Sequence, residues 1–456
     1  MSKITPTLAA TLISSCMGFL VVQLDVSVVN VGLSALREAF KTDLTGLQWV
    51  INSYALVFSA LLILGGALGD KYGAKTVFAW GFGIFTFGSI GCGLADGMAM
   101  LITLRGIQGI GAALLVPTSL TLIRLTFQDT NTRRTAVAMW GACGGIALAA
   151  GPVLGGILIQ YLGWRSVFLI NVPIGLIAII LILRFAPASP RVDKKVDVPG
   201  QIASAIAIAS LTYALTESSD RGWTMLPLVA LCLAILSTLI FTVTERHVAD
   251  PMLPPRLVKN KMLIAMCLSG AVINLVFYGT VFVLSLFFQT VKGYGAFQTG
   301  IAFIPLTAVL TVSTMISSRV ARRVSAIRII TTGFSVQIIG FLLLSQLSVN
   351  SSLWLLNGAL MLVGMGSAMS VPSVTNTMLA SVSQHDAGIS SGLMASARQL
   401  GGVVGVAIFG ALITHTDTAT FSRGMAKAML LSALVLLFCI VINLIMTRRA
   451  REAVEI

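Results

Sequence analysis

Two nine-residue stretches decide the fold: residues 109–117 read GIGAALLVP, and residues 364–372 read GMGSAMSVP. Glycine, small residues and proline recur at matching places, and the two stretches start 255 residues apart (364 minus 109). The same offset carries the start of the first apolar run, near residue 8, to the start of the ninth, near residue 263. Because the repeat keeps the register of the apolar runs, it predicts two related halves of the chain.

The composition of the whole chain excludes a soluble globular protein. Of the 456 residues, 56% are hydrophobic and only 10% are charged, and the mean hydropathy is +0.95. A soluble domain carries roughly 25% charged residues, so lipid must surround most of this chain. The net charge of +14 comes from Lys and Arg in short segments between apolar runs rather than from one basic face, which argues against a nucleic-acid partner.

The apolar runs predict the membrane spans. A helix needs about 20 apolar residues to cross a bilayer core of about 30 Å. Fourteen runs approach this length, and they cover residues 8–31, 45–67, 76–95, 100–123, 136–162, 165–185, 198–216, 224–243, 263–289, 297–317, 327–347, 353–379, 390–413 and 426–446. An even number of spans puts both termini on the same side of the membrane.

The distribution of Lys and Arg between the loops predicts the orientation. Twenty-one of the 30 Lys and Arg residues fall in segments on the side of the N-terminus, seven fall on the other side, and Arg105 and Arg398 lie within spans. Cytoplasmic loops are enriched in Lys and Arg. We therefore expect a multi-pass protein of the cell (inner) membrane with both termini in the cytoplasm.

The 255-residue offset also predicts the domains, because it pairs runs one to six with runs nine to fourteen. We expect an all-α polytopic membrane protein with a six-helix bundle over residues 1–185, a two-helix insert over 186–260, and a second six-helix bundle with a cytoplasmic tail over 261–456. Two six-span halves related by repetition are typical of transporters, which bind substrate between the halves near the middle of the bilayer.

Asp25 lies deep inside an apolar run, whereas the other 15 of the 16 acidic residues lie in loops, in tails or at span ends. A carboxylate inside the bilayer is costly, and burial disfavours its charged form. Such a group can take up and release a proton, so we expect Asp25 to carry protons or to balance the charge of a cationic substrate. The alternative is an acid that bonds to a neighbouring helix or reaches the outer surface.

Two basic residues also lie within spans. Arg105 begins the stretch 105–111, RGIQGIG, in the fourth run, and it needs a partner, water or a polar cavity because arginine keeps its proton. We expect Arg105 to tune the proton site or, alternatively, to reach the lipid headgroups. Arg398 lies about eight residues into the thirteenth run, and we expect it to reach the cytoplasmic interface.

Glycine-rich sequence in the fifth run indicates close helix crossings. Residues 151–156 read GPVLGG, and residues 141–145 before them read GACGG. Glycines four residues apart let helices approach closely, and proline permits a bend. Plain packing and a role in gating are both open, and the candidates for a gating motif are Gly145, Gly151, Pro152, Gly155 and Gly156.

The turn between the second and third runs, residues 65–75, reads GGALGDKYGAK. Its glycines suit a tight reversal, and its acid can cap a helix or pair with a basic residue of a neighbouring loop. We expect a conformational latch here, made by Gly66, Gly69, Asp70, Lys71 and Gly73.

Aromatic residues within the runs are candidates for a cavity that binds flat, apolar cations, although most aromatics in spans serve packing or interface roles. These candidates are Trp49, Tyr54, Trp140, Phe277 and Tyr278. The sequence holds no nucleotide-binding glycine loop, and its three histidines lack metal-ligand spacing. We therefore expect no catalytic residue, no bound metal and no cofactor, and a transport energy drawn from an ion gradient.

These motifs resemble those of a known family. Residues 65–75 resemble the loop between spans two and three of the major facilitator superfamily, residues 105–111 its span-four motif, and residues 145–156 the span-five motif associated with antiporters. Residues 24–31, LDVSVVNV, resemble the span-one motif of the fourteen-span drug:proton antiporters, which include the quaternary ammonium and methylenomycin resistance exporters. The likeness covers nearly the whole chain.

The resemblance implies roles for particular residues. Asp25 would be the acid that takes the proton, Arg105 would assist proton coupling, Asp70 would stabilise one conformation, and residues 151–156 would favour exchange. The chain departs from the pattern at Ser34, where the span-one motif usually ends in proline.

The function expected from these features is proton-coupled efflux, a drug:proton antiport of hydrophobic, cationic small molecules by alternating access. The protein would act as a monomer in the lipid bilayer, with the substrate and protons as its partners and the proton gradient as its energy source. Two alternatives remain, namely a dedicated transporter of one metabolite or antibiotic, and a non-transporting membrane sensor.

Overall fold

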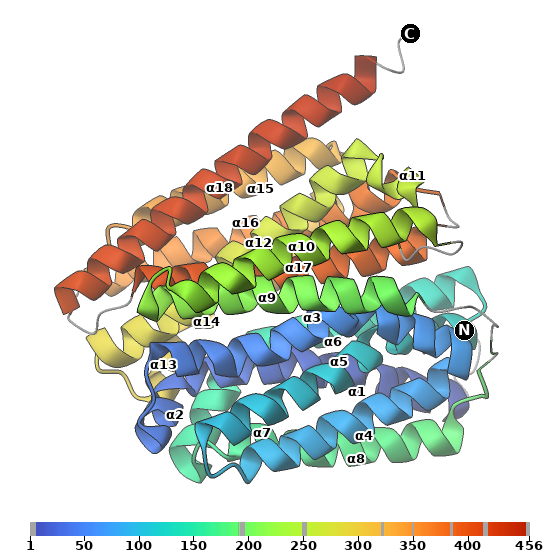
Figure 1. Ribbon diagram of the computed structural model, residues 1–456, viewed down its shortest axis with the longest axis horizontal. Coiled ribbons are helices and arrows are strands. Elements are labelled where there is room, and N and C mark those ends of the chain that lie inside the picture. The colour runs from blue at the N-terminus through green and yellow to red at the C-terminus, as the bar shows by residue number, and fades with distance from the viewer. Residues whose placement is uncertain are drawn as a thin grey trace.

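The structure, a computed structural model, is a bundle of long helices that run roughly side by side (Figure 1). It describes residues 6–189, 191, 197–248, 253–320, 323–348, 351–383, 386–413 and 418–452, and it contains no strand within them. The predicted cytoplasmic tail beyond residue 452 lies outside the described residues.

Two groups of helices correspond to the two halves of the sequence. The first group comprises α1 (Pro6–Val31), α2 (Leu33–Phe40), α3 (Leu44–Tyr72), α4 (Ala74–Gly93), α5 (Met98–Thr126), α6 (Thr130–Leu162), α7 (Ser166–Leu169) and α8 (Asn171–Phe185). The second comprises α12 (Lys261–Leu286), its π-helical continuation η1 (Phe287–Val291), α13 (Ala296–Ala302), α14 (Ile304–Val320), α15 (Ala326–Leu344), α16 (Leu353–Ala380), α17 (Ala387–Leu412) and α18 (Thr418–Glu452). Between them in sequence lie α9 (Val198–Arg221), α10 (Met225–His247) and the short α11 (Pro255–Val258).

Short polar side chains define where several of these helices begin. The Asp43 carboxylate accepts a hydrogen bond from the Gly46 amide at 2.8 Å, and Asp129 and Asp197 cap α6 and α9 in the same way. Each cap satisfies an amide that the first helical turn leaves without a partner. Gly73 joins α3 to α4 at a φ of 90°, a left-handed value that favours glycine.

Thirteen helices among the described residues are long and apolar enough to cross a membrane, judged by length and composition. They correspond to every expected span except 198–216. That stretch is also helical, and the 24 residues of α9 would rise about 36 Å. Helix α9 is less apolar than the other expected spans, and its buried side chains include the polar Gln201, Ser210 and Thr212.

A pseudo-two-fold relation between the halves is visible in the hydrogen bonds that join them. The Ser285 hydroxyl donates to the Asn30 carbonyl at 2.5 Å, and the Ser34 amide donates to the Gln289 side chain at 3.0 Å. In both pairs the two residues are 255 positions apart, which is the offset of the sequence repeat. Equivalent residues that touch each other must lie at the axis relating the halves, so α1 and α12 meet there.

Helices α9 and α10 lie between the two groups in Figure 1, drawn in green. Helix α9 packs against both α3 and α17 and pairs with α10. Three hydrogen bonds hold it to α3: Trp49 donates to Glu217 at 2.9 Å, Asn52 to Thr216 at 3.1 Å, and Gln201 to the Ala60 carbonyl. The insert therefore attaches mainly to the first half and lies along the second.

Candidate functional site

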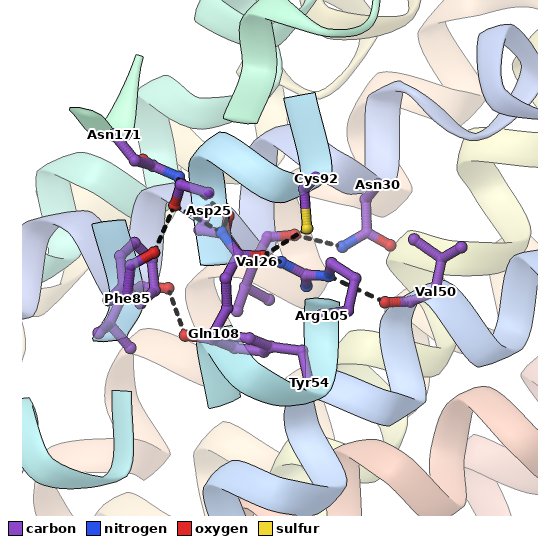
Figure 2. Close-up of polar contacts among 12 residues, drawn as sticks. Asp25, Val26, Asn30, Val50, Tyr54, Phe85, Cys92, Arg105, Gln108 and Asn171 are labelled. Atoms are coloured by element: carbon purple, nitrogen blue, oxygen red, sulfur yellow. Dashed lines mark hydrogen bonds and ion pairs between the residues drawn. The ribbon is translucent and has the colours of Figure 1, made fainter. Parts of the chain in front are cut away.

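Asp25 lies inside the first group of helices and is only 1% exposed. One carboxylate oxygen forms an ion pair with the Arg105 guanidinium. The other accepts hydrogen bonds from the Asn171 amide at 3.1 Å and, at a longer 3.4 Å, from the Gln108 amide (Figure 2). Each of these partners donates to the carboxylate, so the geometry suits the ionised form of Asp25.

Arg105 is as deeply buried as its partner, at 1% exposure. Besides the ion pair, its Nε donates to the Val50 carbonyl at 3.0 Å and its Nη1 to the Gln108 side-chain oxygen at 2.9 Å. The guanidinium carbon also lies 4.4 Å from the centre of the Tyr54 ring, a cation–π distance. A buried ion pair is tolerated when further hydrogen bonds satisfy its remaining groups, and this one meets that condition.

Four helices converge to build this cluster. Arg105 and Gln108 are three residues apart on α5 and so project from the same face. Asn171 is the first residue of α8, where the chain restarts after α7 with Pro173 in the first turn. Ser89 of α4 accepts a hydrogen bond from Gln108 at 2.7 Å and a longer one from Asn171 at 3.5 Å, which fixes both amides.

A central cavity lies between the halves, directly beside Arg105. Its space that no atom fills amounts to about 400 Å³, part of which is open to solvent. Its walls are Val26, Val29, Ile51, Asn52, Tyr54, Ala55 and Arg105 from the first half, and Tyr278, Gln399, Gly402, Val403 and Val406 from the second. Asp25 is not part of the wall, because Arg105 stands between its carboxylate and the cavity. Both roles expected for Asp25, as proton carrier and as counter-charge for a cationic substrate, stay predictions.

A second cavity of about 300 Å³ lies between α1, α6, α12 and α14. It is lined by Ser27, Asn30, Leu148, Pro152, Phe277, Tyr278, Val281, Phe303, Leu306 and Thr307. Tyr278 belongs to both cavities, so a single side chain of α12 separates two mainly apolar spaces. Hydrophobic small molecules suit such surroundings.

Polar contacts close the gap between the halves at the end of the bundle where α2 lies. Gln289 bridges there by donating to the Val31 carbonyl at 3.0 Å while accepting from the Ser34 amide. Together with the bond between Ser285 and Asn30, these contacts form what we call the outer seal: Asn30, Val31, Ser34, Ser285 and Gln289. The charge distribution predicts that this end is extracellular.

A further contact at the same end joins α3 to α17. The Gln48 side chain donates to the Val406 and Ala407 carbonyls at 3.1 and 3.3 Å. A Cβ atom at Gly410 would collide with this side chain. The glycine therefore permits the close approach on which this part of the closure depends.

The predicted aromatic residues separate into two sets. Tyr54, Phe277 and Tyr278 line the cavities, as expected. Trp49 does not, because its indole bonds to Glu217 on the insert, whose position the sequence did not indicate. Trp140 does not either, because it stacks on Phe19 with ring centres 4.0 Å apart and donates to Ser119.

The turn predicted to act as a latch has clear local geometry. A Cβ at Gly69 would lie 2.8 Å from Thr118 of α5, so this glycine permits the close crossing of α3 and α5. A Cβ at Gly66 would lie 3.8 Å from Pro117, an ordinary van der Waals distance, so the packing there does not require glycine. Lys71 lies 5.5 Å from the Tyr72 ring centre. Asp70 is exposed, and no residue within the described ranges forms an ion pair with it. The latch role stays a prediction.

The glycine motif of α6 faces two different neighbours. A Cβ at Gly151 would lie 2.4 Å from the Ser27 Cβ atom, and one at Gly155 would lie 3.0 Å from Val28, so both glycines pack on α1. A Cβ at Gly156 would lie 2.7 Å from the Ala296 carbonyl of α13, in the second half. Gly145, in contrast, would meet nothing within 4 Å.

Pro152 and Gly300 form the reciprocal contact across the halves. A Cβ at Gly300 would lie 2.3 Å from the Pro152 carbonyl. The stretch 151–156 thus touches α1 on one side and the second half on the other, which is the position that a gating role requires. Whether it gates transport stays a prediction.

Three residues of the Asp25 cluster were missed by sequence reasoning: Ser89, Gln108 and Asn171. Gln108 lies one helical turn after Arg105, so its position on the same face was available from spacing. Asn171 is an amide in an otherwise apolar run and next but one to Pro173, a signal that marked a polar contact without identifying its partner. Nothing in the sequence distinguishes Ser89 from other small span residues.

A two-half helical bundle with apolar cavities between the halves and a buried acid–base pair beside them defines a multi-pass membrane transporter. The model of the Major Facilitator Superfamily matches residues 15–406. The chain belongs to this family, whose members are transporters rather than enzymes.

Among curated relatives, the chain is 34% identical to the methylenomycin A resistance protein of Bacillus subtilis (strain 168), over 92% of this chain and 91% of that protein. It is 35% identical to the cephamycin export protein CmcT of Amycolatopsis lactamdurans, over 91% and 86% of the two chains. It is 32% identical to the multidrug resistance protein Stp of Mycobacterium tuberculosis (strain ATCC 25618 / H37Rv), over 92% and 78%. The relatives are drug and antibiotic exporters, which supports a transporter for drug efflux.

Solved structures agree with this fold. A bacterial homologue of the human lysosomal transporter Spinster, in an inward-facing and unoccupied conformation, superposes with a TM-score of 0.69 at 16% identity and covers 98% of both chains. A structure described in work on substrate recognition in proton dependent oligopeptide transporters superposes with a TM-score of 0.67 at 16% identity. The match covers 99% of this chain and 100% of that chain. The predicted all-α major facilitator fold is confirmed.

Proposed function

We propose that this protein exports hydrophobic small molecules in exchange for protons, by alternating access. The observation that carries the proposal is the buried pair of Asp25 and Arg105 next to the central cavity. Asp25 is held at depth with donors around it, and its ion-pair partner Arg105 lines the cavity. A proton that binds Asp25 therefore changes the charge at the cavity through its partner.

The coupling follows from electrostatics. While Asp25 is ionised, its charge balances that of Arg105, and both can stay buried. A proton on Asp25 removes this balance and leaves the Arg105 cation without its counter-charge in a poorly polarisable environment. The free energy of the cluster then falls if Arg105 reaches water. This requires a rearrangement of α1 and α5, and that rearrangement is the step that links the proton to the motion of the halves.

Alternating access would move residues 1–185 against residues 261–456 about the axis at which α1 meets α12. The outer seal closes the extracellular end in this conformation, and the exposed Asp70 is compatible with a cytoplasmic latch that is open. We propose both termini in the cytoplasm, action as a monomer, and no cofactor beyond the proton gradient.

A dedicated exporter of one antibiotic is the second candidate. The printed names of two relatives favour it, since each refers to a single compound class, methylenomycin A or cephamycin. Efflux assays over a chemically broad panel separate the two candidates. One transported scaffold supports the dedicated exporter, and several unrelated ones support the multidrug exporter.

Dye transport in everted membrane vesicles tests the main proposal. Wild-type vesicles energised by respiration should accumulate a transported xanthene dye, and a proton uncoupler should abolish the accumulation. Asp25→Asn, which mimics the protonated carboxyl, should abolish uphill accumulation while downhill dye exchange continues. Uphill transport by Asp25→Asn at the wild-type rate would refute the role given to Asp25.

A further inference from the structure

Arg398 of α17 is a second cation between the helices, and it is half-buried whereas Arg105 is fully buried. Its Nε donates to the Asn274 side-chain oxygen of α12 at 3.3 Å. Gly270 makes this course possible, because a Cβ there would lie 3.1 Å from the Arg398 Cγ atom. The side chain thus turns toward α12 in the interior, whereas the sequence led us to expect it at the cytoplasmic interface.

The charge of Arg398 has no counter-charge among the described residues. Its guanidinium offers five N–H donors and keeps its proton, yet the described contact is to a neutral amide, and no described carboxylate lies within ion-pair distance. Arg105, by comparison, is matched by Asp25, by Gln108 and by a backbone carbonyl. A half-buried cation inside a membrane-spanning helix, with no described anion beside it, is a candidate for a function.

The surroundings of Arg398 connect it to the space between the halves. Tyr278 lies one helical turn beyond Asn274 on α12, interacts with Arg398 and with the Gln23 side chain of α1, and lines both cavities. The residue after Arg398, Gln399, is itself part of the central cavity wall. Arg398 and Asn274 line neither cavity themselves, so the guanidinium lies next to the wall that Tyr278 and Gln399 form, and a ligand would reach it past Tyr278.

The first half of the chain shows that packing does not require a charge at this place. The 255-residue offset relates Arg398 to Cys143 and Asn274 to Phe19. In the first half, Phe19 stacks on Trp140 and presses against Gly144, so the contact between α1 and α6 at this level is apolar. The second half places a cation and an amide at these two positions, and Tyr278 lies beside them; all three side chains can donate hydrogen bonds to an anion.

We propose that Arg398, Asn274 and Tyr278 form an anion subsite that binds a carboxylate, or an equivalent acidic group, of the exported molecule. Arginine pairs with carboxylates through two parallel hydrogen bonds, and the apolar cavities accept the remainder of the molecule. The substrates are accordingly hydrophobic organic acids, and not the cations that a lone buried acid in the sequence had suggested. This inference rests on the proposed efflux function and names the substrate class for it.

Two dyes with one ring system test the proposal. Fluorescein is an anion and rhodamine 123 a cation, and both contain a xanthene ring. In proteoliposomes under an imposed proton gradient at one fixed pH, the wild type should transport fluorescein. Arg398→Gln should raise its KM about tenfold or more, since a charge-assisted hydrogen bond is lost, and Arg398→Lys should retain part of the affinity because it keeps the charge but loses the two-pronged geometry.

Further variants separate recognition from folding. Arg398→Glu should weaken fluorescein transport further and improve that of rhodamine 123, an exchange of preference that a misfolded protein cannot produce. Arg37→Gln, which removes a charge from α2 at the remote end, should leave both dyes unaffected. Fluorescein transport with the same KM in the wild type and Arg398→Gln would overturn the subsite.

The remaining outcomes distinguish the subsite from the function. A wild-type protein that moves rhodamine 123 under the proton gradient but not fluorescein would overturn the anion subsite while supporting proton-coupled efflux. A wild-type protein that moves neither dye would count against the proposed efflux function, and the subsite would fall with it.

Discussion

Asp25 and Arg105 illustrate how a membrane protein keeps two opposite charges at depth. Each would be costly alone, but together they form a neutral pair whose remaining hydrogen-bonding groups are satisfied by Gln108, Asn171 and the Val50 carbonyl. The pair is therefore stable only while Asp25 is ionised. Its sensitivity to one proton is a direct consequence of its low exposure.

Asn171 holds the Asp25 carboxylate in place, because its amide donates to one carboxylate oxygen. Asn171→Leu removes this donor, so it should lower the rate of proton-coupled dye efflux. A loss of about tenfold is the size expected for one hydrogen bond to a charged group. Initial rates of dye efflux, divided by the amount of folded protein, measure this loss.

Asn443→Leu is the matched control for that experiment. Asn443 is also a fully buried amide, but it bonds to Ser269 in the second half, far from Asp25 in the sequence and in a different group of helices. Its loss should lower stability without lowering the efflux rate per folded protein. Equal efflux rates for Asn171→Leu and the wild type would contradict the role assigned to Asn171.

Charged residues of the site could be predicted from the sequence, whereas their neutral partners could not. A carboxylate or guanidinium within an apolar run is rare enough to identify itself, as Asp25 and Arg105 did. Amides and hydroxyls are tolerated in many places, so Asn171 and Ser89 gave no comparable signal. The course of Arg398 was mistaken because a long side chain can reach either the interface or a neighbouring helix, and only the packing at Gly270 decides between them.

Helix α6 is the element whose packing most directly connects the two halves. Its residues 151–156 pack on α1 through two glycines and touch α13 through a third. Since α1 carries Asp25, a movement of α6 relative to α1 would act at Ser27 and Val28, within one helical turn of the proton site. The glycines therefore belong to the path along which the halves and the proton site influence each other.

Gly151→Ala should destabilise the protein. The added methyl group would lie 2.4 Å from the Ser27 Cβ atom, and overpacking of this kind costs about 1–3 kcal/mol. Gly145→Ala adds the same group on the same helix where nothing lies within 4 Å, so it should be neutral or slightly stabilising. Thermal unfolding in detergent compares the two, and equal unfolding temperatures would show that the α1–α6 contact is looser than described.

Helix positions followed from hydropathy and from the repeat, and thirteen of the fourteen expected runs are candidate spans. The insert was also expected as a helix pair, but its location was not. Hydropathy measures how apolar a segment is and carries no information on which neighbour it packs against. The attachment of α9 to α3, through Trp49 and Asn52, therefore became known only from the structure, and Trp49 was assigned to the wrong surroundings for that reason.

The molecule as a whole is closed at the α2 end by hydrogen bonds between equivalent residues of its two halves, which lie at the axis that relates the halves. Asn30 and Ser285 occupy equivalent positions in the two halves and bond to each other. The proposed rocking of the halves would separate such a pair, because both members lie at the α2 end of the axis. In the proposed orientation, the outer seal is the part of the structure that has to open before a substrate leaves.

A cross-link across the outer seal should stop transport. Asn30→Cys combined with Ser285→Cys, in a background that lacks the native cysteines, can be joined by a short bifunctional thiol reagent. Dye efflux should be lost on cross-linking and recovered on reduction, because the halves can no longer separate at that end. Full efflux by the cross-linked protein would contradict alternating access through this seal.

The insert provides a matched control for the cross-link. Ala60→Cys with Gln201→Cys joins α3 to α9, where the Gln201 side chain donates to the Ala60 carbonyl. Because the insert attaches mainly to the first half, this cross-link should leave efflux intact. A loss of efflux on this cross-linking would indicate that α9 moves relative to α3 during the transport cycle.

Counting protons during transport tests the central claim most directly. Proteoliposomes in weakly buffered medium, given an outward gradient of whichever xanthene dye the wild type carries, should show dye exit coupled to proton entry, recorded with a pH electrode as alkalinisation of the medium. In Asp25→Asn liposomes, dye should leave down its gradient without any movement of protons. Proton entry that accompanies dye exit equally in Asp25→Asn and the wild type would contradict the coupling through Asp25 and Arg105.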